Sequence, residues 1–503
     1  MTNRTHGLNT ILRILRAPAV RTSLAALAVA VPFLASPRVA SAQAWLRDRR
    51  VSEGQGIRVG DADLHPGIGA EIGYDSNWFL RTHKEDPRFV NGAPQNPVVS
   101  GGVIRITPSL TLRMPPERPE TTGTGPAAPS PLVFTAGIAA TYREFIGPKE
   151  LTDQRNIAGN AFVRLDINQG KPVGFGVFAT YQRLIQPAVV ADPNLSFNRS
   201  DVGAGAEVVV TPGGGTLDMR AGYQFFGALF EESNGAPYTN YTHEISVRNR
   251  WRFRPRTALF SDTSLRFTSY PNADRAVNYL NDSTPLRTRF GVTGLLSDRF
   301  GVLLAAGYGA TFFKNPEQVG TPQYDSINAQ AEGTFYLSQG GGTNEPGKAT
   351  LLLSTISLGY VRDFQASLLG NFYTSNKGYG KVVYAFGNKV VLQLDAYFEA
   401  LSFPQPFFNS GAGGVPRAVN GADGNPTGDF TNFRVGGVLF GEYRFTSAFA
   451  ANATIDYAQM ISDVALDAGG APLPGPGGAA APATLFDLSW RRVQALVGVR
   501  YFF

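Results

Sequence analysis

VQALVGVRYFF, residues 493–503, ends the chain and indicates its fold. Val497, Val499, Tyr501 and Phe503 share one face of a strand with period two, and Arg500 lies on the other face. A final strand with one apolar face and a terminal aromatic residue is typical of the strand that closes an outer-membrane β-barrel. In such a barrel one face meets lipid and the other meets the lumen.

The amino terminus predicts secretion. Arginines precede an apolar run over residues 22–34, and Ala40-Ser41-Ala42 offers the small residues that a signal peptidase reads. The run is too short for a transmembrane helix, which needs about 20 apolar residues. We therefore predict a cleaved signal peptide over residues 1–42, a short periplasmic lead-in over 43–65 and one barrel domain over 66–503.

Composition excludes several function classes. The chain has 45 basic and 39 acidic residues, and removing the five arginines of residues 1–42 leaves 40 against 39. A nearly neutral mature chain gives no support for nucleic-acid binding. The absence of cysteine excludes disulfides and thiolate sites. A mean hydropathy of −0.10, with no long apolar run after the signal, argues against helical membrane spans.

From Pro66 onward the chain alternates apolar and polar residues in runs of about 10–16 residues, separated by turns. We count about eighteen strands, the first at 67–77 and the fourteenth at 349–362, with Arg362–Asn371 as an external loop. Short turns such as Asn168–Lys171 are expected on the periplasmic side. An even number of strands then returns the last strand to the periplasm.

Charged residues are confined to one face of each strand. In the strand at 239–254, Ile245, Val247 and Trp251 oppose Glu244 and the arginines. A charge on the lipid face costs about 2–4 kcal/mol near the bilayer midplane, so this pattern is expected of a barrel in lipid. A soluble β-sandwich or propeller would also alternate. Long strands and tyrosines near strand ends favour the membrane barrel.

The candidate pore-lining residues are charged side chains at inward positions. They are Arg248, Arg250, Arg252, Arg254, Arg266, Arg287, Arg289 and Glu244 on one wall, and Asp395, Glu399, Glu442 and Asp456 on the opposite wall. Either the arginines pair with inward acids such as Asp218 and brace the wall, or they stay free and favour anions. Inward aromatic candidates for contact with a polysaccharide are Phe162, Phe178, Phe226 and Tyr397.

Catalytic chemistry has few candidate residues. His65 is expected before the first strand, His243 lies at a lipid-side position, and His83 with Asp86 forms the only local histidine–carboxylate pair. A solvated charged loop explains that pair. There is no metal-binding or phosphate-binding motif, so we predict no enzyme, no cofactor and no metal.

Five short segments resemble a known family. Ile57–Gly60, His65-Pro66 and Gly73–Asn77, together with Gly359–Phe364 and Gly370–Tyr373, resemble β-barrel porin-2 type outer-membrane proteins, including those found beside exopolysaccharide export genes. Val497, Val499, Tyr501 and Phe503 resemble the C-terminal signal that the barrel-assembly machinery recognises. The family resemblance implies an outer-membrane channel and supplies no catalytic residues.

These features together predict a single transmembrane antiparallel β-barrel of about 18 strands in the outer membrane of a Gram-negative bacterium. The expected function is passage of hydrophilic solutes. The family resemblance adds an exit portal for an exopolysaccharide, with the polysaccharide and periplasmic export proteins as partners. The alternative is a non-conducting anchor or scaffold for periplasmic secretion or surface machinery, with the proline-rich segment 115–131 as its contact. Expected partners in every case are outer-membrane lipid and the barrel-assembly machinery.

Overall fold

The computed structural model describes residues 56–83, 97–114, 131–169, 171–185, 198–231, 236–273, 281–314, 323–337, 354–367, 371–386, 389–404, 407–408, 417–418, 428–467 and 485–503. The predicted signal peptide lies outside these residues. So do nearly all of the proline-rich segment 115–131 and most of the connections 403–428 and 463–485.

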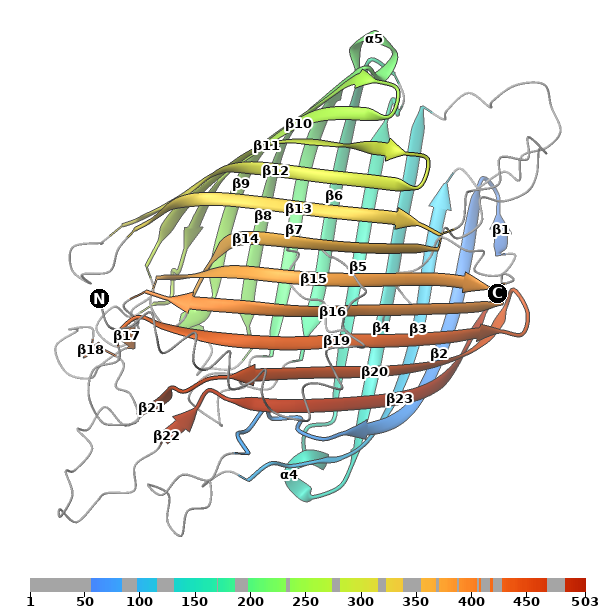
Figure 1. The fold of residues 1–503 in the computed structure, drawn as a ribbon. Coiled ribbons are helices and arrows are strands. Elements are labelled where there is room, and N and C mark those ends of the chain that lie inside the picture. The colour runs from blue at the N-terminus through green and yellow to red at the C-terminus, as the bar shows by residue number, and fades with distance from the viewer. Residues whose placement is uncertain are drawn as a thin grey trace.

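Eighteen long antiparallel strands form a closed barrel (Figure 1). They are β2 (Ala62–Asp75), β3 (Gly101–Met114), β4 (Leu132–Ile146), β5 (Asn156–Ile167), β6 (Val173–Leu184), β7 (Arg199–Val210), β8 (Leu217–Phe230), β9 (Asn240–Arg254), β10 (Thr257–Ser269), β11 (Ser283–Ser297), β12 (Phe300–Phe313), β13 (Tyr324–Tyr336), β14 (Thr355–Ala366), β15 (Phe372–Phe386), β16 (Val390–Phe403), β19 (Phe430–Arg444), β20 (Phe449–Ile461) and β23 (Trp490–Phe502). The predicted fold class and strand count are confirmed.

Pairing between the first and last long strands closes the barrel. β2 pairs with β23 in register from Gly67 opposite Phe502 to Asp75 opposite Gln494. The terminal residue adds two backbone bonds, because the Phe503 N–H donates to the Pro66 carbonyl (3.1 Å) and its own carbonyl accepts from the Gly56 N–H (3.1 Å). No open sheet edge remains between the two ends of the chain.

The remaining elements are short. They are β1 (Ile57–Val59), α4 (Lys149–Thr152), α5 (Pro212–Gly215), η3 (Ala236–Tyr238), and the hairpin pairs β17 (Phe407–Phe408) with β18 (Arg417–Ala418) and β21 (Ala465–Asp467) with β22 (Leu485–Asp487). Among the described residues, no helix is long and apolar enough to cross a bilayer.

Two predicted boundaries are wrong. β1 forms a hairpin with the start of β2, from Ile57 opposite Leu64 to Val59 opposite Ala62, so His65 lies within β2 and not before it. β14 continues to Ala366, and the predicted loop Arg362–Asn371 shrinks to residues 367–371. In both cases the strand is extended by pairing with another strand. The alternating pattern of a single segment does not show where such pairing begins or ends.

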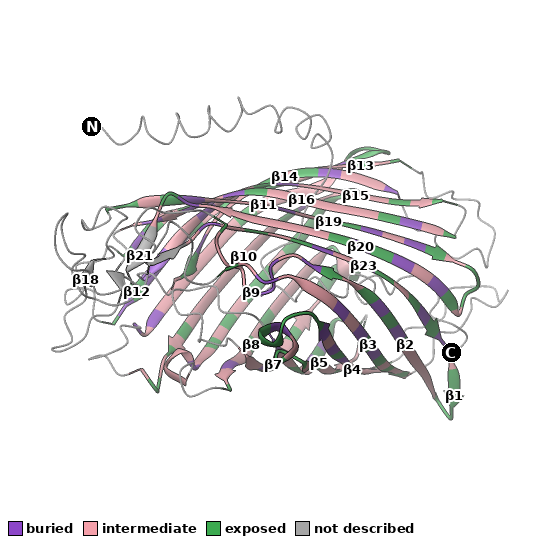
Figure 2. Cartoon of the chain, turned by 90° about the horizontal axis from the view of Figure 1, so that it is seen from below, coloured by how far each residue is buried: buried purple, intermediate pink, exposed green. Residues whose placement is uncertain are grey.

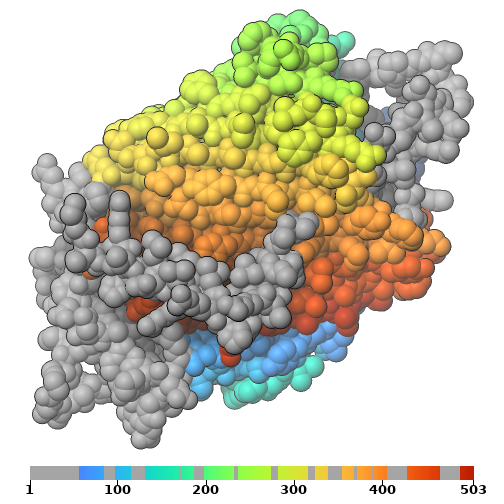
Figure 3. All heavy atoms as spheres, viewed as in Figure 1, coloured from blue at the N-terminus to red at the C-terminus, as the bar shows by residue number. Residues whose placement is uncertain are grey.

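The two faces of the wall differ as a lipid environment requires. On β23, Val497, Val499 and Phe503 are 58%, 44% and 56% exposed on the outside, whereas Arg500 and Phe502 are buried on the inside. Figure 2 shows buried positions recurring along β2, β3, β20 and β23, while β7 to β10 carry mostly intermediate and exposed ones. From outside, the strands from β10 to β20 make a continuous wall (Figure 3).

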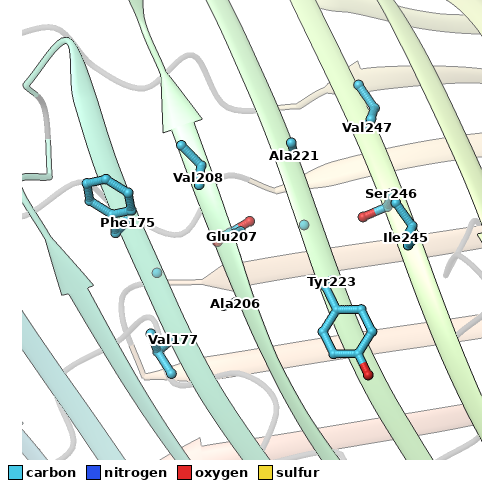
Figure 4. A pocket seen from close by; sticks show the side chains of 12 residues that line it. Phe175, Val177, Ala206, Glu207, Val208, Ala221, Tyr223, Ile245, Ser246 and Val247 are labelled. Carbon is cyan, nitrogen blue, oxygen red and sulfur yellow. The ribbon is translucent and has the colours of Figure 1, made fainter.

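The outer wall carries a shallow groove of about 370 Å³ over β6 to β9 (Figure 4). The small residues Ala206 and Ala221 form its floor, and Phe175, Tyr223 and Ile245 stand around it. These large side chains are all more than 40% exposed on the lipid-side face. We expect lipid acyl chains to fill the groove, because its lining is apolar.

Candidate functional site

The strand β9 places three arginines on the inner wall. Trp251 is 52% exposed on the outer face, so the residues that alternate with it point into the barrel. These residues are Arg248, Arg250 and Arg252, here called the arginine ladder, and all three are exposed. An exposed side chain on an inner face requires solvent in that part of the lumen. Arg254, which the alternation predicted to point inward, follows a β-bulge and lies opposite Thr257, on the face of the outward Leu259.

The other predicted basic residues of this wall are paired. Arg266 Nε lies 2.5 Å from Glu244 Oε2, Arg289 Nη2 lies 2.8 Å from Asp262 Oδ2, and Arg287 Nε lies 3.1 Å from Asp363 Oδ1. For these arginines the structure brings an inward acid into contact with the cation. Arg266 and Arg289 brace neighbouring strands, and Arg287 reaches from β11 to β14, so these three arginines pair with inward acids as one of the two interpretations expected.

The arginine ladder makes no ion pair within the described residues. Asp218 lies opposite Arg250 and Asp262 lies opposite Arg248 in strand register, yet other arginines hold both carboxylates. Arg220 binds Asp218 through two contacts of 2.9 and 3.2 Å, and Arg289 binds Asp262. The acids nearest the ladder therefore form their ion pairs with other arginines, although Arg250 and Arg252 still interact electrostatically with Asp218.

On this part of the inner face, positively charged side chains outnumber negatively charged ones. On β8 to β11 the inward arginines are Arg220, Arg248, Arg250, Arg252, Arg266, Arg287 and Arg289, and the acids that pair with them are Asp218, Glu244, Asp262 and, from β14, Asp363. The three ladder arginines remain as an excess of positive charge on this sector of the wall. Bracing thus describes the paired arginines, and the ladder is the candidate for attracting anions.

The predicted acidic wall is made of engaged carboxylates. Glu399 is 4% exposed, accepts a hydrogen bond from the Ser375 hydroxyl (2.7 Å) and pairs with Arg434. Glu442 is equally buried, with Arg444 Nε at 2.5 Å and Arg500 in contact. These two acids act as strand braces, so their charge is compensated locally.

The other two predicted acids also lie on the inner face. Asp395 accepts a hydrogen bond from the Gln393 amide (2.5 Å) and lies 3.8 Å from Lys381 Nζ. Asp456 is opposite Gln494 in the pairing of β20 with β23. The structure thus places all four acids inside the barrel, distributed over β16, β19 and β20.

Sequence reasoning missed a buried polar network at the closing seam between β2 and β23. Asp75 is 0% exposed, and both its carboxylate oxygens lie 3.0 Å from Arg492 Nε. The Gln494 amide donates to the same carboxylate at 2.8 Å. Asn77 completes the seam by donating to the carbonyls of Arg81 (2.7 Å) and Arg491 (3.0 Å). In the sequence, the only indication of this network was the segment Gly73–Asn77, which contains Asp75 and Asn77 and was interpreted as a family motif.

Six inward aromatic rings rest on glycines of the neighbouring strand. The register pairs are Phe162 with Gly137, Phe178 with Gly205, Phe260 with Gly291, Tyr379 with Gly359, Tyr397 with Gly436, and Phe502 with Gly67. A Cβ added at any of these glycines would lie within 2.4–2.6 Å of the aromatic side chain. Each ring therefore covers its glycine and lies against the wall instead of standing in the lumen.

The histidines form no catalytic group in the described part of the chain. Burial, with a smaller contribution from the positive charge of Arg491, lowers the pKa of His83 below its ordinary value. Its predicted partner Asp86 lies outside the described residues. His243 is on the outer face, where its Nδ1 lies 2.7 Å from the Tyr223 hydroxyl. No group of three metal-ligating side chains occurs within the described ranges.

The architecture determines the compartment. A closed antiparallel barrel satisfies its backbone hydrogen bonds without an exposed edge, as a bilayer requires. Its outer face is apolar and its inner face is charged and polar, which is the arrangement of outer-membrane barrels. The chain is a barrel of the bacterial outer membrane.

Comparison with known proteins adds no family. No family model matches the chain, and no curated protein matches it in sequence. Among solved structures it is similar to OccAB4 of Acinetobacter baumannii, with 10% identity over 88% of this chain and 98% of that chain and a TM-score of 0.39. It is also similar to OpdK of Pseudomonas aeruginosa with vanillate, with 8% identity over 88% of this chain and 100% of that chain and a TM-score of 0.41. For the siderophore receptor PirA of Pseudomonas aeruginosa the identity is 8% over 89% of this chain and 81% of that chain, with a TM-score of 0.39. Similarities of this size carry no argument about what this chain does.

Proposed function

We propose that the barrel is a channel through which hydrophilic solutes cross the outer membrane, with a preference for anions. The observation that carries the proposal is the arginine ladder, a row of exposed cations on the inner wall whose neighbouring acids are held by other residues. Barrels of 16–18 strands are wide enough to enclose an aqueous lumen. A basic wall in such a lumen raises the local concentration of anions and lowers their barrier to entry.

Conductance tests the proposal directly. The mature barrel, refolded in detergent and inserted into a planar bilayer, should give discrete current steps in potassium chloride. Variants lacking residues 403–428 or 463–485 should conduct at least as well, because the strands β16, β19, β20 and β23 that flank these connections form the wall. If neither the full chain nor the two deletion variants gave any current, this result would contradict the channel function and favour a non-conducting scaffold.

We propose as a second, narrower function that the channel is the exit portal of an exopolysaccharide. The family resemblance motivates it, and the partly exposed rings of Phe162, Phe178, Phe260 and Tyr397 on the inner wall support it, because a ring lying against the wall can offer one face to a passing sugar without narrowing the lumen. Deleting the gene should remove the surface polysaccharide and leave its assembly in the inner membrane intact. An unchanged amount of surface polysaccharide would contradict the portal function, and the barrel would then be a general solute channel.

A further inference from the structure

We propose that the outer groove over β6 to β9 is a binding site for one anionic phospholipid of the periplasmic leaflet. Its acyl chain lies in the groove, and its phosphate lies at Lys171. Lipid contacts the whole outer wall of a barrel, whereas this site has one place, one leaflet and one headgroup charge. It requires a barrel in a membrane and is independent of whether the lumen conducts.

The groove is a gap between large side chains of the outer wall. Ala206 of β7 and Ala221 of β8 form its floor, and Figure 4 shows both between Phe175 and Ile245. Phe175 is 46% exposed and Ile245 is 52% exposed, so these two side chains project toward the lipid. A hydrocarbon chain that lies over the two alanines touches the groove from below and from both sides. It therefore makes more van der Waals contacts than a chain on a flat part of the wall.

The groove is oblique to the barrel axis. In strand register, one row of its lining is Phe175, Val208, Ala221 and Val247. Phe175 lies two residues from the start of β6, whereas Val247 lies seven residues from the end of β9. Both of these strand ends adjoin short turns, which lie on the periplasmic side. The groove therefore rises from the periplasmic interface at β6 toward the middle of the membrane at β9.

The length of the groove matches the acyl chains of one leaflet. Neighbouring strands are about 4.8 Å apart, so the row across four strands spans about 14 Å. The hydrocarbon core of a bilayer is about 30 Å thick, and one leaflet fills half of it. A lipid with its headgroup near the start of β6 can place one chain along the row, with the chain end near Ile245. A lipid of the opposite leaflet has its headgroup at the other ends of the strands and reaches the groove only with its chain end.

A single cation lies at the periplasmic end of the groove. The turns 168–172 and 211–216 lie side by side there, and the Thr211 hydroxyl donates to the Lys171 carbonyl (2.9 Å). These turns contain no acid, and the exposed Lys171 is their only charged residue. Lys171 precedes Phe175 by four residues, at most about 13 Å of chain, which the glycerol and ester groups of a phospholipid can bridge. A lysine at this interface favours a headgroup with net negative charge.

Lipid counting by native mass spectrometry tests the site. The full barrel in detergent micelles is titrated with phosphatidylglycerol, or with phosphatidylethanolamine that has the same acyl chains. We expect one phosphatidylglycerol to bind at low concentration, before the gradual uptake of further lipids. Phosphatidylethanolamine should bind in this first step about fivefold more weakly, because its own ammonium group neutralises the phosphate. Added salt should reduce the difference by screening.

Two variants with matched controls separate the chain from the headgroup. Ala206→Leu combined with Ala221→Leu fills the floor of the groove and should abolish the first binding step for both lipids. Its control, Ala306→Leu, adds a leucine to an exposed outward position of β12 and should leave that step unchanged. Lys171→Gln should remove the preference for phosphatidylglycerol. Its control, Lys389→Gln, changes an exposed lysine of the turn before β16 and should preserve the preference.

Photochemical cross-linking locates the lipid without any variant. Phosphatidylglycerol with a diazirine at the end of one acyl chain is added to the wild-type barrel at one equivalent and illuminated. The label should appear mainly on peptides of β8 and β9 that contain Tyr223 and Ile245, where the chain end lies. This readout keeps the site testable if the variant with two leucines assembles poorly.

Three outcomes would overturn the inference. If the label spread evenly over the outer wall, or if the groove-filled variant bound its first lipid as tightly as the wild type, only bulk lipid would cover the groove. If the wild type bound the two lipids equally in the first step, an anionic headgroup at Lys171 would be wrong. None of these readouts depends on conductance, so a barrel that does not conduct would refute the channel and leave the lipid site standing.

Discussion

Arginines of this barrel have two distinct roles that depend on their partners. Arg492 is held against the buried Asp75 at the seam, whereas the arginine ladder faces the lumen without an ion pair in the described part of the chain. Residue type and inward position are the same for both. The difference arises because Arg492 holds Asp75, whereas the acids opposite Arg248 and Arg250 form their ion pairs with Arg289 and Arg220.

Asp75→Asn should destabilise the barrel strongly. Removing the charge leaves the Arg492 guanidinium beside a neutral amide in a buried site, and breaking a buried ion pair in this way costs about 3–5 kcal/mol. The free energy of unfolding, measured by guanidinium titration of the refolded barrel in micelles, should fall by about that amount. The matched control is Asp298→Asn, which removes the exposed turn partner of Arg256 and should cost less than about 1 kcal/mol. Equal costs at the two positions would refute the role of the seam.

Glu231 should make stability depend on acid pH. It lies just beyond the end of β8, and the pKa of its carboxyl is lowered chiefly by hydrogen bonds from Arg183, at 2.6 Å each. Since the folded-state pKa is below the ordinary 4.5, this stabilisation is present above pH 4.5 and is lost as the pH falls through the lower folded value. The contribution is small, because both side chains are about one-third exposed and solvent screens them.

The test compares unfolding of the wild type and Glu231→Gln between pH 6 and pH 3. The wild type should lose more stability over this interval than the variant. Parallel curves for the two proteins would show that Glu231 contributes nothing to the pH dependence.

At the scale of strands, the glycine–aromatic pairs explain how a wall rich in inward rings keeps its lumen open. Gly137→Ala places a Cβ 2.5 Å from a ring atom of Phe162, and every close contact there is with that ring. The ring must turn away from the wall. We expect a loss of stability of about 1–3 kcal/mol from overpacking, together with a smaller single-channel conductance.

A double-mutant cycle isolates this effect. Phe162→Ala alone removes the ring, and the combination with Gly137→Ala should cost little more than Phe162→Ala alone, because the added methyl group then meets no ring. If the stability losses of the two single variants simply added in the double variant, Gly137 would be required for its backbone conformation and not for the ring that covers it.

Strand positions could be predicted from the sequence because lipid confines charged residues to alternate positions, and this period of two is a local property. The end of β14 could not. It pairs with β13 only as far as Arg362, and its last residues pair with β15 as far as Ala366 opposite Phe372. The contact of Asp363 with Arg287 and the Phe364 ring, 4.0 Å from that of Tyr324, add to this pairing. These contacts join distant segments of the chain. For the same reason the sequence identified the inward arginines but not which of them are paired.

Phe503 contributes to closure of the whole barrel, beside the pairing of β2 with β23. Phe503 is 56% exposed on the outer face, and its backbone bonds to Pro66 and Gly56 connect the final strand to the β1–β2 hairpin. We expect deletion of Phe503 to reduce the amount of folded barrel in the outer membrane several fold, because it removes both the closing bonds and the proposed recognition residue for the assembly machinery. Phe503→Trp keeps the backbone and an aromatic ring and should assemble normally.

Heat-modifiable mobility on gels, measured on isolated outer membranes, reports the folded fraction. Normal assembly of the deletion variant would contradict the role of the terminal residue. Poor assembly of both variants would mean that the phenylalanine ring itself, and not aromatic character, is read.

The measurement that tests the account most directly is the reversal potential of single channels under a potassium chloride gradient. The wild-type barrel should conduct, and its reversal potential should be shifted from zero toward the equilibrium potential of chloride. Replacing Arg248, Arg250 and Arg252 by glutamine should move the reversal potential to zero or toward the equilibrium potential of potassium, while Asp262→Asn with Arg289→Gln should leave it unchanged. A cation-selective wild-type channel, or a reversal potential that does not respond to loss of the ladder, would contradict the account.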